Sequence, residues 1–304
     1  MRTIAIPLHD SPAAMTRPTK TTATVPPHAS GTDLWGFFAF SHGWTWLCWG
    51  VVAVWGVELW TSPLAMAVFA AGGLGLPVGG AYMTWRTAGR EGLRDLGRRL
   101  VEPGRLSPWW WAVVLGLQPA IKLAAGGLAL LLGATDAPFD LEQATALALQ
   151  PVDLLLYLGF VFLLGPLPEE IGWRGYLLDR LQARFTALGA SILVGIAWFA
   201  YHWPLFFIAG YYARAGGAPD PVRFGIAIVL GAILYTWIYN HTDRSVLAAI
   251  VFHFSGNVTG ELLDAGSAVY AYETYLTVLL VLVLLWWEGG ATLHGRSADR
   301  SRDG

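Results

Sequence analysis

Two adjacent carboxylates and an arginine lie inside a strongly apolar chain, in the segment PEEIGWR at residues 168–174. Ionisable groups are expensive at membrane depth, so they usually face a protein interior or a wet cavity and indicate function. Glu170 and Arg174 stand four residues apart and would meet on one face of a helix. Glu169 is rotated by about 100° from Glu170. We therefore expect Arg174 to hold Glu170 ionised and fixed, while Glu169 is free to transfer protons.

This motif alone has a second interpretation. The segment GPLP at residues 165–168 should end one helix, because proline lacks a backbone N–H and restricts the residue before it. Pro168 would then suit the first position of a new helix. Residues 171–186 could form an amphipathic helix at the membrane interface. In that case Glu170 and Arg174 would be an ordinary ion pair at a helix end.

Two further polar clusters follow in apolar segments. His202 lies in the stretch IAWFAYHWP at residues 196–204, where Pro204 predicts a kink. His253 and Asn257 are four residues apart and would share one helix face. A single histidine in an apolar helix is more often a hydrogen-bonded structural residue, and a His–Asn pair could simply join helices. The clusters are therefore weak singly and stronger together.

Taken jointly, the clusters contain the groups of a hydrolytic site. Glu169, His202, His253 and Asn257 provide a base, two imidazoles and an amide that could donate to a developing oxyanion. No HExxH motif is present, and Cys48 is the only cysteine. A divalent metal, with zinc as the first candidate, would have to bind His202, His253 and Glu169. The alternative is a metal-free site in which Glu169 activates water and the imidazoles stabilise the oxyanion. The sequence leaves both open.

The elements that must position these groups are membrane helices. The 304 residues are 55% hydrophobic and only 13% charged, where a soluble domain carries about 25%. The net charge of −2 gives no indication of nucleic-acid binding. Eight segments are long and apolar enough to cross a bilayer. They are residues 36–58, 62–85, 108–134, 151–168, 188–209, 222–240, 245–263 and 274–290. We expect an all-α, polytopic membrane helix bundle with about eight transmembrane helices.

The remaining sequence divides into tails and loops. We expect a disordered N-terminal tail at 1–33, a transmembrane domain at 34–292 with a protease-like core at about 150–265, and a cytoplasmic C-terminal tail at 293–304. The arginine-rich loop 86–106 and the acidic loop 135–150 lie on opposite sides of the membrane. The positive-inside rule then places both termini in the cytoplasm of an integral, multi-pass cell-membrane protein.

Several charged residues need separate interpretations. Residues 94–106 resemble a basic amphipathic helix on the cytoplasmic surface. Lys122 falls within a predicted span. It could line a cavity, pair with a carboxylate, or be a structural lysine that faces the cytosol or the protein. His42 and Glu58 are expected at the membrane interface. Counted from the helix ends, the three polar clusters lie at different depths, so they can converge only if the helices bend.

The three motifs resemble the CPBP family of intramembrane proteases, also called Abi. This family includes the type II CAAX prenyl endopeptidases and the lysostaphin-resistance-protein-A-like proteins. Its pattern is EExxxR, then FxxxH, then HxxxN or HxxxD, which residues 169–174, 198–202 and 253–257 match in order. Trp198 stands where the family usually has phenylalanine, and we expect this difference to affect only local packing. The resemblance is strongest over residues 150–265.

The resemblance implies an α-helical fold whose site lies in a membrane cavity open to the cytosol. It implies that Glu169 is the base that activates water. It also assigns the other residues, with His202, His253 and Asn257 completing the site and Glu170 and Arg174 supporting it. The family is usually described as metalloproteases, although a metal-free glutamate mechanism is also argued for it.

We therefore predict an intramembrane endopeptidase that hydrolyses a peptide bond in a membrane-associated or lipidated protein. The expected partners are that peptide substrate and membrane lipid, with no nucleic acid. CAAX processing itself does not follow, because nothing in the sequence recognises a prenyl group. One alternative is a non-catalytic membrane scaffold or bacteriocin-immunity protein on the same fold. A proton-coupled transporter is another, although no repeat symmetry is apparent.

Overall fold

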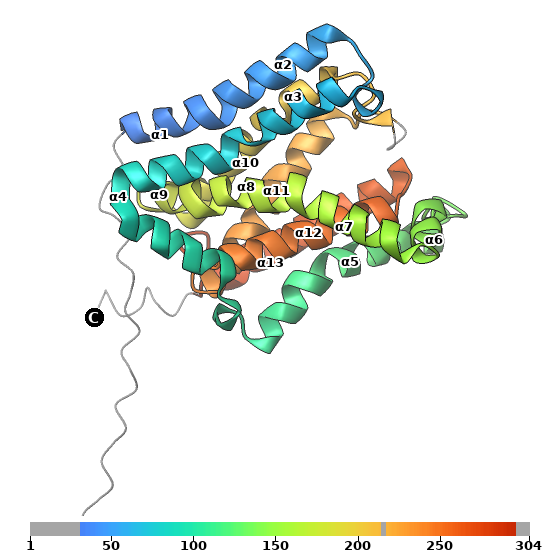
Figure 1. Cartoon of the computed structure of the whole chain (residues 1–304). Helices are drawn as coiled ribbons and strands as arrows, with labels where there is room; N and C mark the ends of the chain where they lie inside the picture. Colours follow the sequence, from blue (N-terminus) through green and yellow to red (C-terminus); the bar gives the residue numbers. More distant parts are fainter. Residues whose placement is uncertain (1–30, 214–216, 296–304) are drawn as a thin grey trace, which may run out of the picture.

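The chain folds as helices arranged around two central segments, α8 and α9, as Figure 1 shows for a computed structural model that describes residues 31–213 and 217–295. The α-helices are α1 (Gly31–Phe38), α2 (Thr45–Trp55), α3 (Pro63–Gly73), α4 (Gly75–Val101), α5 (Pro108–Leu131), α6 (Glu142–Ala148), α7 (Pro151–Leu164), α8 (Pro166–Gly172), α9 (Leu178–Gln182), α10 (Ala187–His202), α11 (Pro221–His241), α12 (Val246–Leu262) and α13 (Ser267–Glu288). The described residues form no β-strand, only an isolated bridge between Asp140 and Asp264. The predicted all-α fold class is confirmed.

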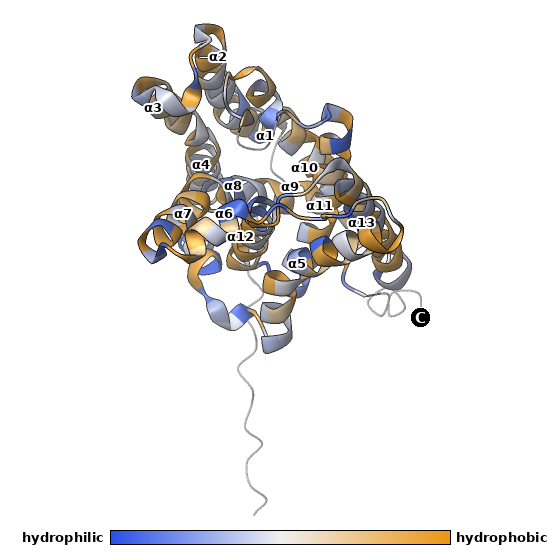
Figure 2. Cartoon of the chain, turned by 90° about the vertical axis from the view of Figure 1, so that its right-hand side faces the viewer, coloured by the Kyte–Doolittle hydropathy of each residue, from blue (hydrophilic) through white to orange (hydrophobic). Residues whose placement is uncertain are grey.

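Seven helical stretches of the described chain are long and apolar enough to cross a membrane. They correspond to seven of the eight predicted segments. The remaining predicted segment, 245–263, forms α12, which is apolar but only 17 residues long. Large apolar side chains cover the outside of the bundle, as on α7, where Leu155 and Leu156 are exposed. Figure 2 shows apolar residues along the outer helices. Such a surface suits contact with lipid rather than with water.

Several helix boundaries in the structure differ from those predicted from the sequence. Helix α1 begins at Gly31, inside the segment predicted as a tail, while residues 1–30 lie outside the described residues. Residues 94–106 do not form a separate surface helix. They continue α4 beyond a kink at Gly89, which has φ of 61° and ψ of −155°, and the helix ends at Val101. Arg99 is buried in this stretch, so it packs into the protein instead of anchoring the chain to lipid.

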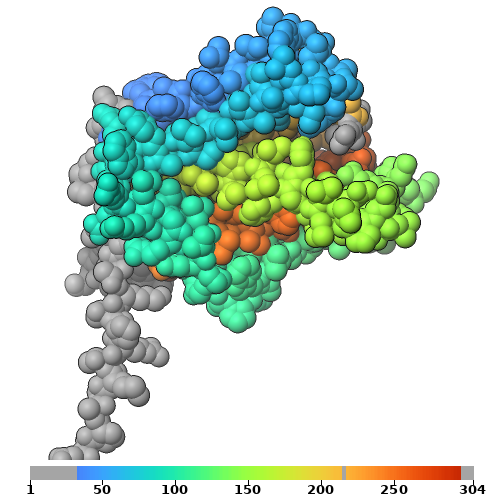
Figure 3. Space-filling model, in the orientation of Figure 1, coloured from blue at the N-terminus to red at the C-terminus, as the bar shows by residue number. Residues whose placement is uncertain are grey.

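Helices α4 and α8 pack closely because glycines line their contact. A β-carbon added at Gly80 would lie 2.9 Å from the backbone oxygen of Ile171. One added at Gly172 would lie 2.0 Å from a methyl carbon of Leu76. Small residues allow membrane helices to approach in this way, where dispersion contacts replace the hydrophobic effect. The contact holds α8, which carries the paired carboxylates, against α4 (Figure 3).

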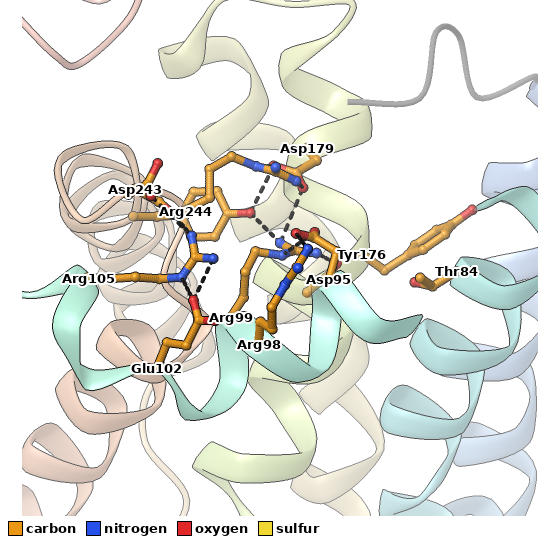
Figure 4. Close-up of polar contacts among 12 residues, drawn as sticks. Thr84, Asp95, Arg98, Arg99, Glu102, Arg105, Tyr176, Asp179, Asp243 and Arg244 are labelled. Atoms are coloured by element: carbon orange, nitrogen blue, oxygen red, sulfur yellow. Dashed lines mark hydrogen bonds and ion pairs between the residues drawn. The ribbon is translucent and has the colours of Figure 1, made fainter. Parts of the chain in front are cut away.

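A buried polar cluster joins the ends of four elements (Figure 4). Asp179 of α9 accepts hydrogen bonds from Arg99 of α4 at 3.3 Å and from the Tyr239 hydroxyl of α11 at 2.8 Å. Arg244, just before α12, also binds Asp179 through two nitrogens. Asp95 pairs with Nε of Arg99 at 2.9 Å. Two arginines thus balance two aspartates, so no charge in the cluster is left uncompensated.

The Asp179→Asn substitution should destabilise the protein, because it leaves Arg244 without its paired carboxylate and Arg99 with Asp95 alone. Removing one member of a buried ion pair costs about 3–5 kcal/mol. We expect a clear drop in the thermal unfolding midpoint of purified protein in detergent. The control is Asp243→Asn, which removes an exposed pair with Arg105 and should cost less than about 1 kcal/mol. Equal midpoints for the two variants would contradict the importance of the cluster.

The Gly80→Ala substitution should separate α4 from α8, because the backbone oxygen of Ile171 cannot rotate away as a side chain can. Overpacking of this kind costs about 1–3 kcal/mol. The same thermal unfolding measurement checks it. Gly97→Ala, on the same helix with open space around it, is the matched control and should not lower the midpoint. A Gly80→Ala midpoint at or above that of the wild type would show that the contact tolerates a methyl group.

Candidate active site

A break between α7 and α8 positions Glu169. Helix α7 ends at Leu164, and Gly165 takes φ of −124° and ψ of −89° before Pro166 begins α8. The new helix thus starts two residues before the predicted Pro168. The backbone N–H of Glu169 donates to the Gly165 oxygen at 3.1 Å, so Glu169 lies in the first turn of α8. A π-helical turn follows at Trp173–Leu177, and such turns are frequent at functional sites.

Glu169 faces the end of α10, where His202 and Trp198 lie. Its Oε2 accepts a hydrogen bond from the indole Nε1 of Trp198 at 2.7 Å. Its Oε1 lies 3.8 Å from Nε2 of His202, which is too long for a direct hydrogen bond but suits a bridging water. Among the described residues, no arginine or lysine pairs with Glu169. Its charge is therefore not neutralised by a fixed cation.

The hydrogen bonds of His202 define its tautomer. Its Nδ1 lies 2.8 Å from the backbone oxygen of Trp198. A carbonyl oxygen can only accept, so Nδ1 carries the hydrogen. In the neutral imidazole, Nε2 then has a free lone pair directed toward Glu169. Two acceptors, Oε1 of Glu169 and Nε2 of His202, thus face one another across a gap that a water molecule can bridge.

Glu170 points away from Glu169 and binds two partners. Both of its oxygens accept from Nη1 of Arg174, at 3.0 and 2.9 Å, and neither side chain of this pair is exposed. Oε1 of Glu170 also lies 2.9 Å from Nδ1 of His253 on α12. The predicted Glu170–Arg174 pair is therefore present. It also orients an imidazole, so that Nε2 of His253 remains free for other contacts.

Aromatic rings enclose the buried cation. The guanidinium carbon of Arg174 lies 4.1 Å from the ring centre of Tyr235 and 4.9 Å from that of Trp198. Its Nε and Nη2 make no hydrogen bond to any residue that the structure describes. The faces of the two rings attract the cation in place of further acceptors. The Trp198 ring also meets the imidazole of His253 at a centroid distance of 5.3 Å.

Asn257 lies one turn beyond His253 on α12. A β-carbon added at Gly165 would come within 3.2 Å of its amide nitrogen, so the amide lies at the break between α7 and α8. Its side chain makes no hydrogen bond within the described part of the chain. Both donors of the amide are therefore available to a ligand.

The structure thus brings together the four predicted site residues. Their depths differ when residues are counted along each helix from its end. The break at Gly165 and the π-helical turn provide the bending that convergence requires. The role of Trp198 was missed, because phenylalanine and tryptophan are equivalent as packing residues but only tryptophan donates a hydrogen bond. The polar indole of a tryptophan four residues before a histidine was the signal that could have found it.

Three other residues singled out from the sequence lie outside this site. Lys122 pairs with Glu273 of α13 at 3.2 Å, and its Nζ lies 3.9 Å from the ring centre of Tyr270. Of the predicted interpretations, pairing with a carboxylate is observed. Nε2 of His42 hydrogen-bonds the backbone oxygen of Ala197 at 2.9 Å, and its position at the membrane interface stays a prediction. Glu58 is exposed beyond the end of α2.

The predicted metal ligands can be compared with this geometry. His202 and His253 each have one ring nitrogen held by an acceptor and one free, which is how metal-binding histidines are usually oriented. However, no three histidine, cysteine, aspartate or glutamate side chains in the described ranges are grouped to hold one ion. Glu169 also has one oxygen bound to Trp198. As arranged, these residues do not fit a three-ligand zinc site.

Comparison with known proteins agrees with the motifs. Residues 151–259 match the family described as type II CAAX prenyl endopeptidase Rce1-like. The chain is also 31% identical over 179 residues to CAAX prenyl protease 2 of Methanococcus maripaludis, which covers 58% of this chain. The match spans 65% of that relative, just under two thirds of its length. In the region that contains Glu169, His202, His253 and Asn257, the chain is therefore similar to the Rce1-like type II CAAX prenyl endopeptidases.

Proposed function

We propose that this protein is an intramembrane endopeptidase in which Glu169 activates water. The observation that carries the proposal is the pair of acceptors formed by Oε1 of Glu169 and Nε2 of His202, 3.8 Å apart. A water molecule at about 2.8 Å from each would donate one hydrogen to each acceptor. Its oxygen lone pairs would then be free to attack a substrate carbonyl carbon, while Glu169 takes the proton.

His253 and Asn257 have complementary roles in this proposal. Attack on the carbonyl gives a tetrahedral oxyanion, which needs hydrogen-bond donors in a fixed position. The free amide of Asn257 is such a donor. A doubly protonated His253 would be a second donor through Nε2, with its Nδ1–H bound to the Glu170 carboxylate. The proton held by Glu169 then passes to the leaving amine, which completes hydrolysis and restores the carboxylate.

The proposed substrate is a peptide segment of a membrane-associated or lipidated protein. Two features support this: the catalytic groups lie within a bundle covered by apolar side chains, and the matched relative is named a CAAX prenyl protease. We propose the same orientation as the sequence indicates, with both termini in the cytoplasm. This orientation places the arginine-rich end of α4 and the cluster around Asp179 on the cytoplasmic side.

The Glu169→Gln substitution should abolish proteolysis, because an amide cannot accept the proton of the attacking water. General-base catalysis contributes about a hundredfold to ten-thousandfold in rate, so kcat should fall by at least about a hundredfold. The measurement is the cleavage of an internally quenched, farnesylated peptide that ends in a CAAX sequence, in proteoliposomes. An unprenylated copy of the peptide tests the need for the lipid.

The control for this experiment is Glu142→Gln, which changes an exposed carboxylate on α6 and should leave the rate unchanged. Folding of both variants is checked by their thermal unfolding midpoints. Cleavage that persists in folded Glu169→Gln protein would contradict the role of Glu169. A biological effect that survives Glu169→Gln and His253→Ala would instead favour a non-catalytic scaffold.

The metal question has its own test. Because the described residues do not group around one ion, we expect cleavage to persist in a chelating buffer. We also expect purified wild-type protein to contain far less than one zinc per chain by mass spectrometry. A full equivalent of zinc that disappears in the His202→Ala/His253→Ala double variant would overturn this expectation. It would show that the three side chains close around an ion when one is bound.

A further inference from the structure

Trp198 lies at the centre of the site, and each part of it contacts a different group. Its indole Nε1 donates to Oε2 of Glu169 at 2.7 Å. Its backbone oxygen accepts from Nδ1 of His202 at 2.8 Å. Its ring packs edge-on against His253 and lies beside the guanidinium of Arg174. The side chain is only 7% exposed, so these contacts are made away from bulk solvent.

The indole contact determines which oxygen of Glu169 can act. A glutamate side chain has several rotatable bonds and loses considerable entropy when it is held in one rotamer. With Oε2 bound to Trp198, the other oxygen is left facing His202. An indole N–H can only donate. It therefore cannot take up the proton that Glu169 removes from water, and it does not compete with the reaction.

We propose that Trp198 is a positioning residue for the general base. Its N–H holds Glu169 by Oε2 and directs Oε1 toward the water that attacks the substrate, an inference that rests on the function proposed above. The contact is strong because the site has a low dielectric constant. Without it, the Glu169 carboxylate has no other direct hydrogen bond to a described side chain, and it can rotate away from His202.

At position 198, the hydrogen-bond donor of the side chain matters more than the shape of the ring. The pattern that this chain resembles has phenylalanine at the position of Trp198, which fills the same space and has no donor. In this chain the base is therefore held by a contact that the pattern does not specify. The backbone oxygen that holds His202 is present with any residue at position 198. A side-chain substitution thus separates the positioning of Glu169 from that of His202.

The first experiment compares Trp198→Phe with Trp173→Phe. Trp173 is equally part of the buried core, but its Nε1 has no hydrogen-bond partner among the described residues. Both substitutions remove the same ring volume, and only one removes a contact to Glu169. The measurements are kcat and KM for the farnesylated, internally quenched peptide. We expect Trp198→Phe to lower kcat about 10- to 100-fold with KM changed less than twofold, and Trp173→Phe to change neither by more than twofold.

A second substitution covers the case in which Trp198→Phe does not fold. Benzothienylalanine introduced at position 198 keeps the shape of the indole and replaces its N–H by sulfur. It should reproduce the loss of kcat while the thermal unfolding midpoint stays near that of the wild type. A kcat within twofold of the wild type for this variant, or an equal loss in Trp173→Phe, would overturn the proposal.

The hydrogen bond can also be observed without any substrate. In protein with ¹⁵N-labelled indoles, the signal that disappears in Trp198→Phe belongs to Trp198. We expect this proton to resonate downfield in the wild type and to move upfield in Glu169→Gln, because a charged acceptor becomes neutral. A Trp198 indole proton with the same chemical shift in the wild type and in Glu169→Gln would contradict the hydrogen bond.

The two proposals fail in different ways. A wild-type protein that leaves the peptide intact would contradict the peptidase function, whatever the indole signal does. Cleavage that Glu169→Gln abolishes and benzothienylalanine at position 198 leaves unchanged would contradict only the role of Trp198.

Discussion

The charge of Glu170, a carboxylate with no exposed surface, constrains the surrounding structure. Moving an uncompensated carboxylate out of water costs several kcal/mol even after relaxation. Two partners of Glu170 offset this cost: Arg174, one turn later in the chain, and the imidazole of His253 from another helix. Because both partners must lie within hydrogen-bond distance, α8 and α12 have one relative position. That position directs the other carboxylate of the pair, Glu169, toward α10.

The same constraint explains how a short helix is held. Helix α12 is about 25 Å long at 1.5 Å per residue, less than the roughly 30 Å of a bilayer core. Two ionic contacts attach it to the rest of the bundle. Arg244, just before its first residue, binds Asp179, and His253 in its middle binds Glu170. Asp243 and Arg244 adopt positive φ angles of 52° and 58°, which are uncommon outside glycine. The ion pair with Asp179 holds this turn in place.

Irregular backbone and small residues complete the arrangement. An unbroken helix through residues 151–182 could not direct Glu169 into the bundle and also place Asp179 among the arginines of Figure 4. The break at Gly165 sets the direction of α8, and the π-helical turn after Gly172 changes the phase of the helix between these two carboxylates. Gly80 and Gly172 then let α4 approach the altered backbone. Broken helices occur at membrane depth where other helices satisfy the freed backbone groups.

The sequence by itself determined the fold class, the approximate spans and the residues that could do chemistry. Apolar runs of fixed length and isolated charges follow directly from the energetics of a bilayer. The i to i+4 pairing of Glu170 with Arg174 is local, so it too was predictable. Only the tertiary structure decided that His253 binds Glu170, that Arg99 is buried against Asp179, and that Trp198 holds Glu169. These contacts join residues from 29 to 83 positions apart, and they depend on how the broken helices bend and pack, which no local spacing specifies.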